Sequence, residues 1–579
     1  MKKTFLFTFV LFIFPAVILA EDPGDIARRY FAEALIHWGR GEFVEARESL
    51  AKAMAGEVYL EDIPEFWYFL AKMDLEEGEI RKAREELNNV SLFAYRPEVA
   101  YLSEVIDTIL ERRVETPKIT DVEEAMVIEG FQNDVELFYT PVSADLFDER
   151  LLVLDGTNDR LAVVDSGGVK IWSLKTLGLN ECRDLVVDKL TGWMYISTKT
   201  GTIWRVKDFS PSGVERIGDG YIFPQLAGTD RIGRIYVLDT GRSKVNILDY
   251  NGNKKMELSP EQGFAPLLSI TKNAFNVALF DAEKNQILSF DRFGNLVDMF
   301  SPPDGAHVKS IALDPFGNFF LLDGRGKVHF KNVGSDEWNH VEYPRSFDGI
   351  RFSFPYLIAW SIRDNQVVLF NTNYSTVSMN LYIHSIQVKP QVEITLTYGV
   401  MLITGDPVLS SSRFTEVYDS GGRVTAELIF ERTTPQIHHV SSDNDFNQLL
   451  PLLDRGSPNI VFLETDDSSL PLETIFPLLL KNVALFTTCE ELTELARMSG
   501  GDFVAPEEVP ELAGYLQQVR WPEMKAVYSV TPPISAGIKA ATVLIKMSGL
   551  EYSDTIYYLR EMLQSGFTEE GTSVKQSGE

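Results

Sequence analysis

The chain has 579 residues and a formal net charge of −30. This length exceeds the roughly 250–300 residues that one hydrophobic core supports, so several domains are expected. The 45% apolar content is that of a globular protein, and the negative charge argues against nucleic acid or an anionic membrane surface as a partner. Solubility alone is the simplest explanation of the acidity.

The N-terminus has the organisation of a secretory signal. Lys2 and Lys3 form a basic region, the run from Phe5 to Leu19 is apolar, and Ala20 is a small residue at its exit. The run is shorter than the ~20 residues of a comfortable membrane span, although an uncleaved anchor is the alternative. We expect residues 1–20 to be a signal peptide and the mature chain to be periplasmic or extracellular, with no membrane span.

Cys182 and Cys489 are the only cysteines, and they fall in different expected domains. A disulfide framework is therefore not expected to stabilise the fold. No cysteine follows the apolar run, which argues against a bacterial lipid anchor. An export signal with so few cysteines suits a bacterial cell-envelope protein better than a small disulfide-rich module.

Residues 25–112 carry the periodicity of α-helices. Small and apolar side chains return at helical spacing around two equivalent turns. Gly41 and Gly78, at these turns, are 37 residues apart, as are Ala46 and Ala83. Small residues at these positions allow close helix–helix approach, so the segment predicts two stacked helical pairs.

This arrangement resembles tetratricopeptide (TPR) repeats, whose period is about 34 residues. The extra residues, Val58 to Pro64, then form a lengthened loop, and Tyr101 to Arg112 form a capping helix. The resemblance implies peptide capture. Two repeats are few for an independent groove, so a helical spacer or a docking surface for a neighbouring domain is an equal interpretation.

From residue 151 onward, a short strand that ends in a small polar residue returns every 42 residues. The polar residues are Asp155, Ser197, Asp239, Asp281 and Asp323, and a sixth copy ends at Ser361 after 38 residues. In most copies a turn and a second strand follow, as Leu161 to Asp165 follow Asp155. A period near forty with several strands per unit is typical of β-propeller blades, so six blades are predicted.

Two of these segments are similar to the NHL family of six-bladed propellers. Val153 to Leu161 and Ile235 to Val245 carry the family's pattern of an apolar strand, an aspartate, a turn and a second strand. The resemblance covers residues 126–378 and implies an all-β ring. The strand from Met126 to Phe138 is then expected to close the ring by completing the last blade.

The recurring aspartates invite a catalytic or metal-binding interpretation, which their periodicity contradicts. A residue that returns in most blades is expected to be structural, here capping the turn through backbone N–H groups. His307, His329 and His340 all fall in one blade and cannot surround the central axis. No catalytic residue, no cofactor and no histidine-rich metal site is therefore expected.

Beyond the expected propeller the forty-residue period stops. Residues 379–434 contain a hairpin around Asp419 to Gly422 and predict part of a β-sandwich. Residues 435–522 alternate buried strands with helices and predict an inserted α/β unit with a parallel sheet. Residues 523–563 are expected to return as strands of the sandwich, and residues 564–579 to form a disordered tail.

The α/β segment resembles the second half of a von Willebrand factor A domain (vWA). Leu495 to Phe503 matches that family's helix and Gly-Gly turn, and Phe462 to Asp466 matches its acidic strand end. The family's Asp-x-Ser-x-Ser metal loop has no counterpart, because Asp406 lies at the wrong spacing from Ser410. Only Asp466 matches a metal position, and one carboxylate cannot hold a divalent ion. A degenerate, metal-free domain is expected, with Asp466 as a weak candidate ligand.

The predicted architecture is multidomain: an α-helical repeat segment, a six-bladed all-β propeller, and a C-terminal β-sandwich with an inserted vWA-like unit. These folds bind partners, so we expect a non-catalytic exported scaffold that binds other proteins, an inference by analogy between folds. Two alternatives are open. One is a propeller-type hydrolase or lyase, and the other is a solute- or glycan-binding receptor. The partners, the binding module and the oligomeric state are not specified by the sequence.

Overall fold

The computed structural model describes residues 22–39, 42–76, 79–93, 99, 102–103, 106, 116–132, 134–208, 210–258, 267–273, 276–375, 378–389, 393–400, 415–420, 422–441, 449, 453, 458–464, 483–530 and 538–559. Strands account for 49% of the structure, so the fold is mostly β. Within these ranges, no helix has both the length and the apolar character needed to cross a bilayer. The expected signal peptide and C-terminal tail lie outside the described residues.

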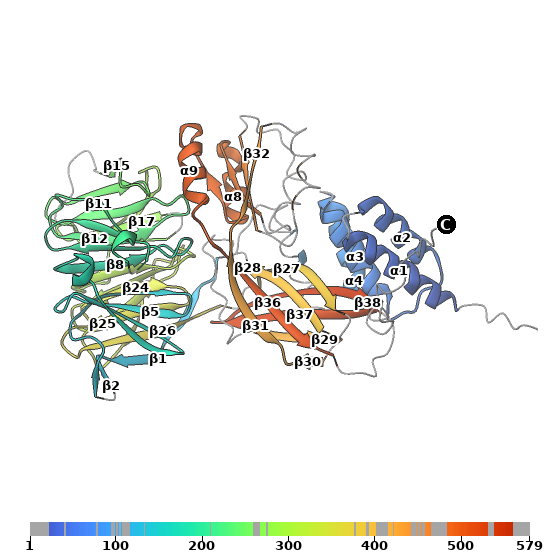
Figure 1. Ribbon diagram of the computed structural model, residues 1–579, viewed down its shortest axis with the longest axis horizontal. Coiled ribbons are helices and arrows are strands. Elements are labelled where there is room, and N and C mark those ends of the chain that lie inside the picture. Colours follow the sequence, from blue (N-terminus) through green and yellow to red (C-terminus); the bar gives the residue numbers. More distant parts are fainter. Residues whose placement is uncertain are drawn as a thin grey trace, which may run out of the picture.

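Six four-stranded antiparallel sheets form a ring, which makes the central part of the chain a β-propeller (Figure 1). The first three blades contain β4 (Pro141–Phe147), β5 (Arg150–Asp155), β6 (Arg160–Asp165), β7 (Gly168–Ser173), β8 (Cys182–Val187), β9 (Met194–Thr198), β10 (Ile203–Val206), β11 (Val214–Gly218), β12 (Pro224–Thr229), β13 (Ile235–Asp239), β14 (Lys244–Leu248) and β15 (Lys254–Leu258). The last three contain β16 (Leu267–Lys272), β17 (Asn276–Asp281), β18 (Gln286–Asp291), β19 (Leu296–Phe300), β20 (Val308–Leu313), β21 (Phe319–Asp323), β22 (Lys327–Lys331), β23 (Asn339–Glu342), β24 (Gly349–Ser353), β25 (Tyr356–Ser361), β26 (Gln366–Tyr374) and β1 (Ile119–Glu129).

The sixth blade closes the ring by pairing the beginning of the propeller with its end. β1 runs antiparallel to β26, with Ile119 opposite Tyr374 and Glu129 opposite Gln366. The innermost strands of successive blades contact one another around the ring, and β24 contacts β4 to complete it. An N-terminal strand therefore closes the ring, as the sequence predicts.

The closing strand begins earlier than the expected Met126, and it does not extend to Phe138. After Glu129 the chain turns into a separate short hairpin, β2 (Phe131–Gln132) and β3 (Val135–Glu136). Gly130 N–H donates to Asn365 O at 2.8 Å, and Leu137 N–H donates back to Gly130 O at 2.8 Å. These bonds fold the chain onto itself where β1 ends. The propeller spans 119–374 rather than the predicted 126–378.

The inserted segment contains a parallel sheet, as the alternation of strands and helices predicts. Its strands, in spatial order, are β32 (Gln436–Val440), β33 (Asn459–Leu463), β34 (Val483–Thr487) and β35 (Asp502–Phe503). Two helices, α8 (Thr493–Met498) and α9 (Val509–Leu516), belong to this segment. In Figure 1 they lie between the propeller and the rest of the molecule.

The remaining C-terminal strands form one eight-stranded sheet. They are β27 (Ser378–Lys389), β28 (Glu393–Val400), β29 (Thr415–Asp419), β30 (Gly422–Val424), β31 (Glu427–Thr433), β36 (Trp521–Ser529), β37 (Ile538–Met547) and β38 (Leu550–Leu559). Their spatial order is β30-β29-β37-β38-β27-β28-β36-β31. β27 joins the two halves of this order, because its beginning pairs with β38 and its remainder pairs with β28. The β-sandwich stays a prediction.

Both halves of this sheet contribute to one apolar core. Val417 and Val543 come from one half, and Leu396 and Ala526 come from the other. The same core continues into the propeller through blades five and six, where Phe316 belongs to it. Because β36 to β38 return after α9, the parallel sheet is inserted between strands of one larger sheet.

The N-terminal layer contains α1 (Pro23–Gly39), α2 (Phe43–Ala55), α3 (Ile63–Glu76) and α4 (Ile80–Ser91). They pack as two consecutive pairs, α1 with α2 and α3 with α4. Ala46 and Ala83, the equivalent small residues of the two pairs, are both fully buried. Lys72 Nζ donates to Asp554 Oδ1 at 2.9 Å, which fastens this layer to β38. The expected capping helix lies mostly outside the described residues.

Asp74 on α3 and Glu86 on α4 form a buried acidic pair. Asp74 also pairs with Arg47 and lies 3.6 Å from Lys82 Nζ. In the described structure neither Asp74 Oδ2 nor Glu86 Oε2 has a hydrogen-bond partner, and one shared proton would satisfy both. Burial, together with the contact to Asp74, raises the pKa of Glu86 to about 8.

Replacing Glu86 with glutamine is expected to stabilise the protein increasingly as pH rises. The folded pKa of about 8 lies above the ordinary value of 4.5, so the wild type loses stability between these two pH values. Glutamine does not ionise, and it can donate to Asp74. The expected gain at pH 9 relative to pH 5 is at most about 4 kcal/mol, measured by thermal unfolding. A difference that does not vary with pH, or an equal effect of exposed Glu85→Gln, would contradict the shared proton.

Candidate functional site

A cavity of about 380 Å³ occupies the centre of the ring and is lined by the first strand of every blade. We call the end where these strands begin the open mouth, which is lined by Val142, Arg183, Lys199, Gln225, Lys309, Asp348, Gly349 and Ile362. The opposite end, the docked mouth, is lined by Lys189, Thr229, Lys272, Asn273, Pro315, Ser353 and Phe354. Across the described chain, the hydrogen bonds and ion pairs from the propeller to the C-terminal segments lie on the side of the docked mouth.

Serine hydroxyls on four of the six inner strands bond to the neighbouring blade. Ser143 Oγ accepts a hydrogen bond from Leu185 N–H at 3.3 Å and donates to Asp184 Oδ1 at 2.7 Å. Ser269 Oγ accepts from Ile311 N–H at 3.2 Å, and the same bond recurs between Ser310 and the following blade. These side chains satisfy backbone groups of the neighbouring blade and hold the ring closed.

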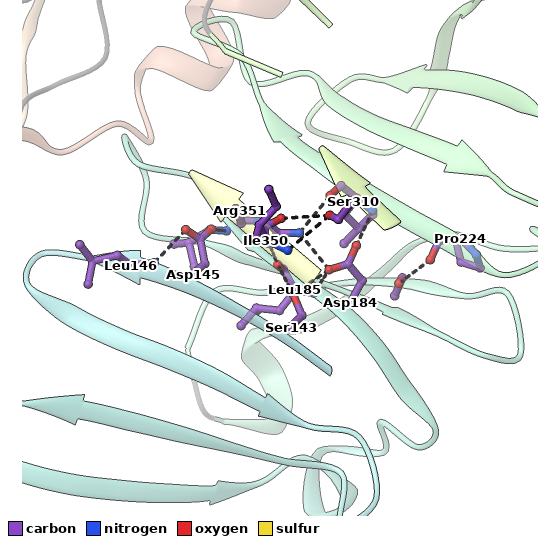
Figure 2. A network of polar contacts seen from close by, with 12 residues as sticks. Ser143, Asp145, Leu146, Asp184, Leu185, Pro224, Ser310, Ile350 and Arg351 are labelled. Carbon is purple, nitrogen blue, oxygen red and sulfur yellow. Dashed lines mark hydrogen bonds and ion pairs between the residues drawn. The ribbon is translucent and has the colours of Figure 1, made fainter. Parts of the chain in front are cut away.

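Arg351 reaches across the channel from blade six to blades two and three (Figure 2). Its Nη2 donates to Asp184 Oδ1 at 2.9 Å and to Leu226 O at 3.2 Å, and its Nη1 donates to Leu185 O. Asp184 Oδ2 accepts from Leu226 N–H at 2.7 Å. One ion pair therefore connects three blades near the axis of the ring.

Lys189 holds a second cluster at the docked mouth. Its Nζ donates to Asp145 Oδ1 at 2.6 Å and to Ser353 Oγ at 3.1 Å. Asp145 Oδ2 accepts from Val187 N–H at 2.8 Å. Blades one, two and six meet at this point.

These contacts define what the channel residues can do chemically. A general acid or base needs a lone pair or proton that substrate can reach. Both oxygens of Asp184 and of Asp145 already accept N–H donors, and each carboxylate faces a cation. The described lining contains no histidine or cysteine, and the described residues hold no cluster of three metal-ligating side chains. The arrangement suits binding better than proton transfer.

The recurring strand-end aspartates have the capping role that their periodicity predicts. The buried Asp155 carboxylate accepts the N–H groups of Tyr139 at 2.9 Å and Thr140 at 3.2 Å. Burial alone would raise its pKa, but hydrogen bonds from Asn158, Tyr139 N–H and Arg160 hold the pKa below its ordinary value. Asp239, Asp281, Asp323 and Ser361 likewise accept backbone N–H groups near their turns.

Ser197 differs from the other members of this series. Its hydroxyl donates to Pro224 O of the next blade at 3.0 Å, so it joins blades rather than capping its own turn. The six positions lie in six different blades, and the structure does not bring them together into one site. None of them lines the central cavity.

The histidines also remain apart from the channel. His329 and His340 lie on adjacent strands of blade five with ring centroids 5.6 Å apart. Burial lowers the pKa of His329, which favours the neutral form. Asp466, Asp406 and Ser410 lie outside the described residues.

A second series of aspartates was missed by the sequence reasoning. Asp188, Asp230 and Asp314 each follow the inner strand of a blade, and each accepts a tyrosine hydroxyl. The first two are 42 residues apart, and a glycine follows each of the three within four residues. This Asp-Gly spacing is the signal that the sequence offers for the second series.

The Asp188 carboxylate binds the inserted α/β segment. Tyr515 OH on α9 donates to Asp188 Oδ2 at 2.9 Å inside the apolar contact. Leu190 and Ile232 of the propeller pack with Leu512 in the same core. Burial raises the pKa of both Asp188 and Tyr515.

Ion pairs surround this apolar contact. Arg292 Nη1 donates to Asp502 Oδ2 at 2.7 Å, with side chains only 5% and 2% exposed. Arg234 pairs with Glu508, and Lys255 pairs with Glu511. Burial lowers the pKa of Arg292 although Asp502 opposes that shift. The inserted segment is therefore docked on blades two, three and four.

Comparisons with known proteins give only distant likenesses. No family model and no curated protein matches the chain. Among solved structures, a selenomethionine-substituted virginiamycin B lyase from Staphylococcus aureus is 12% identical, with a TM-score of 0.33, covering 43% of this chain and 99% of that one. A streptogramin B lyase structure is 11% identical, with a TM-score of 0.34 and coverages of 43% and 98%. The strand pairing and the closed ring described above, rather than these likenesses, identify the propeller.

Proposed function

We propose that this protein is a non-catalytic, exported scaffold of a bacterial cell envelope that binds other proteins. The observation that carries this proposal is the use of the channel's polar groups. Asp184 and Asp145 are engaged by cations and backbone N–H groups, and the serines join neighbouring blades. The described surface is therefore proposed to bind partner proteins rather than to catalyse a reaction.

The way the modules are joined supports the same role. Buried contacts such as Tyr515–Asp188 and Arg292–Asp502 fix the inserted segment on the propeller, and Lys72–Asp554 fixes the helical layer on the large sheet. Surfaces that are fixed in this way can be presented to partners in one relative orientation. We take the helical layer as TPR-like and the parallel sheet as a degenerate vWA-like unit, each offering a separate surface.

Site-specific photo-crosslinking in the native envelope tests the scaffold role. A crosslinker replaces Leu92 in the helical layer or Val297 on the outer strand of blade four, both of which are exposed. We expect the crosslinker at one of these positions to capture a defined protein, which mass spectrometry identifies. The control carries the crosslinker at exposed Lys170 on β7 and is expected not to capture that protein. Absence of a protein adduct from every position would count against a scaffold.

The metal-free character of the vWA-like unit gives a separate expectation. Calorimetric titration of Ca²⁺ or Mg²⁺ into the full chain is expected to show no tight site, because the sequence has no counterpart of the family's Asp-x-Ser-x-Ser loop to join Asp466. Tight binding that disappears in Asp466→Ala would contradict this expectation.

A solute-binding receptor is the second candidate function, and the open mouth favours it. Exposed apolar side chains, among them Tyr139 and Phe223, lie just before the first residues of inner strands at this mouth. Solute-binding sites commonly combine apolar walls with a few polar groups.

A further inference from the structure

The side chains that line the channel carry a net positive charge, whereas the whole chain is negatively charged. Six cationic side chains line the cavity, whereas only three carboxylates do, in a protein whose net charge is −30. The cationic residues are Arg183, Lys189, Lys199, Lys272, Lys309 and Arg351. Charges of one sign in a narrow, low-dielectric cleft concentrate their field on whatever enters it. The channel therefore attracts anions although the molecule as a whole repels them.

Most of these cations are already engaged. Lys189 pairs with Asp145, and Arg351 pairs with Asp184. Lys309 Nζ donates to Phe347 O at 3.0 Å and lies 3.9 Å from Asp348. Lys272 Nζ donates to Thr229 O at 2.6 Å. These four side chains contribute to the field but hold internal partners.

Arg183 and Lys199 differ from the other four. Throughout the described ranges, neither cationic group donates a hydrogen bond or lies within 4.0 Å of a carboxylate oxygen, whereas each of the other four donates to a protein oxygen. In the antiparallel ladder between β8 and β9, Cys182 pairs with Thr198, so Arg183 and Lys199 lie diagonally across this pair, and both line the cavity at the open mouth. Long side chains at such diagonal positions are within reach of one another. Two neighbouring cations without a carboxylate partner can together receive one anionic group.

Exposed apolar side chains lie at the same mouth as these two cations. Tyr139 is 58% exposed and Phe223 is 50% exposed, and Ile222 and Ile362 are also exposed. Tyr139 and Phe223 precede inner strands, while Ile362 follows the strand paired with β24, so all lie at the open mouth. The Arg183 guanidinium lies 5.3 Å from the centroid of the Phe223 ring. An exposed aromatic ring therefore stands directly beside a cation without a carboxylate partner.

We propose that the open mouth binds a small organic anion, in which a carboxylate or phosphate is attached to an aromatic or aliphatic body. The anionic group lies between Arg183 and Lys199, and the apolar body packs on Phe223 and Ile222. The cavity volume of about 380 Å³ falls within the range of small-molecule sites. A long polyanion is disfavoured by the negative charge of the remaining surface. This proposal names the class of solute for the second candidate function and does not rest on the scaffold role.

Calorimetric titration of the full chain at low ionic strength tests the proposal. The probes are phenyl phosphate, benzoate, inorganic phosphate and benzylamine, which separate the anionic group from the apolar body. We expect phenyl phosphate or benzoate to bind at least tenfold more tightly than inorganic phosphate, and benzylamine not to bind. The relative affinity of phenyl phosphate and benzoate shows which anionic group the site prefers. Added salt is expected to weaken binding because the attraction is electrostatic.

Variants assign the site to the named residues. Arg183→Gln and Lys199→Gln are each expected to lower about tenfold the affinity for the aromatic anion that binds more tightly. Lys170→Gln, on exposed β7, is expected to leave that affinity unchanged. Phe223→Ala is expected to reduce the preference for the aromatic anion over inorganic phosphate. Thermal unfolding confirms that each variant is folded. Failure of both aromatic anions to bind, binding of benzylamine with equal affinity, or undiminished affinity in the Arg183→Gln/Lys199→Gln double variant would overturn the proposal.

Discussion

Replacing Arg432 with alanine is expected to cost about 3 kcal/mol and to loosen the C-terminal region from the propeller. Arg432 on β31 forms a two-pronged ion pair with Asp148 in blade one, at 2.7 and 2.5 Å. Its Nη1 also donates to Leu190 O of blade two and to Arg520 O. Its guanidinium lies 4.5 Å from the centroid of the Phe147 ring. Removing it leaves a mostly buried carboxylate and several carbonyl groups without their donor.

Hydrogen exchange at the Arg520 amide measures this loss directly. That N–H donates to Leu190 O at 3.1 Å across the same junction, so its protection should fall in Arg432→Ala. Arg432→Lys keeps the charge but loses the fork geometry and should give an intermediate effect. The matched control is Lys525→Gln, which breaks the partly exposed pair with Glu431 and should cost less than about 1 kcal/mol. Equal effects of Arg432→Ala and the control would show that Arg432 does not hold the junction.

Replacing Asp155 with alanine is expected to destabilise blade one by about 3 kcal/mol. Its buried carboxylate accepts from Arg160 Nε at 2.9 Å and from Asn158 Nδ2 at 3.0 Å, besides the backbone N–H groups near its turn. Alanine removes the acceptor that the backbone N–H groups and Arg160 Nε share at a buried carboxylate. A catalytic role would instead predict a stable variant that has lost an activity.

Asp165 provides the matched control for this substitution. It also ends a strand of blade one, but it is only half-buried, and its carboxylate accepts the Gly167 N–H at 2.8 Å. Asp165→Ala is therefore expected to cost less than about 1 kcal/mol. Urea unfolding monitored by hydrogen exchange in β5 and β6 separates the two variants. A cost for Asp155→Ala no larger than that for Asp165→Ala would refute the structural role of the series.

The blades were predictable because their signal is local and repeated. Most repeats place apolar residues on a strand that is buried on both faces and ends in a side chain that caps the next turn, as at Asp155 and Asp239. The closing strand was harder, because β1 carries exposed charged residues such as Asp121 and Glu123 and lacks the repeat's pattern. β1 pairs with β26 because β26 offers a free strand edge, and the sequence of β1 does not by itself indicate this partner.

The candidate binding site was not predictable in the same way. Arg183 and Lys199 are ordinary surface cations in the sequence, and only the antiparallel pairing of β8 with β9 brings both to the open mouth. Arg292 and Asp502 are separated by 210 residues, so no local pattern links them. Sequence periodicity predicts single strands and helices. The channel and the docking contact depend instead on which strands and helices the folded ring brings together.

The pairing of β1 with β26 also sets the order of events in folding. Lys118 N–H donates to Ser375 Oγ, and these residues are separated by 257 positions. During synthesis, the edge of β1 stays unpaired until β26 of the last blade has been synthesised. Contacts this distant in sequence slow folding and leave a strand edge open to association with other chains. Assembly of this protein is therefore expected to be most vulnerable to aggregation before Tyr374 has been synthesised.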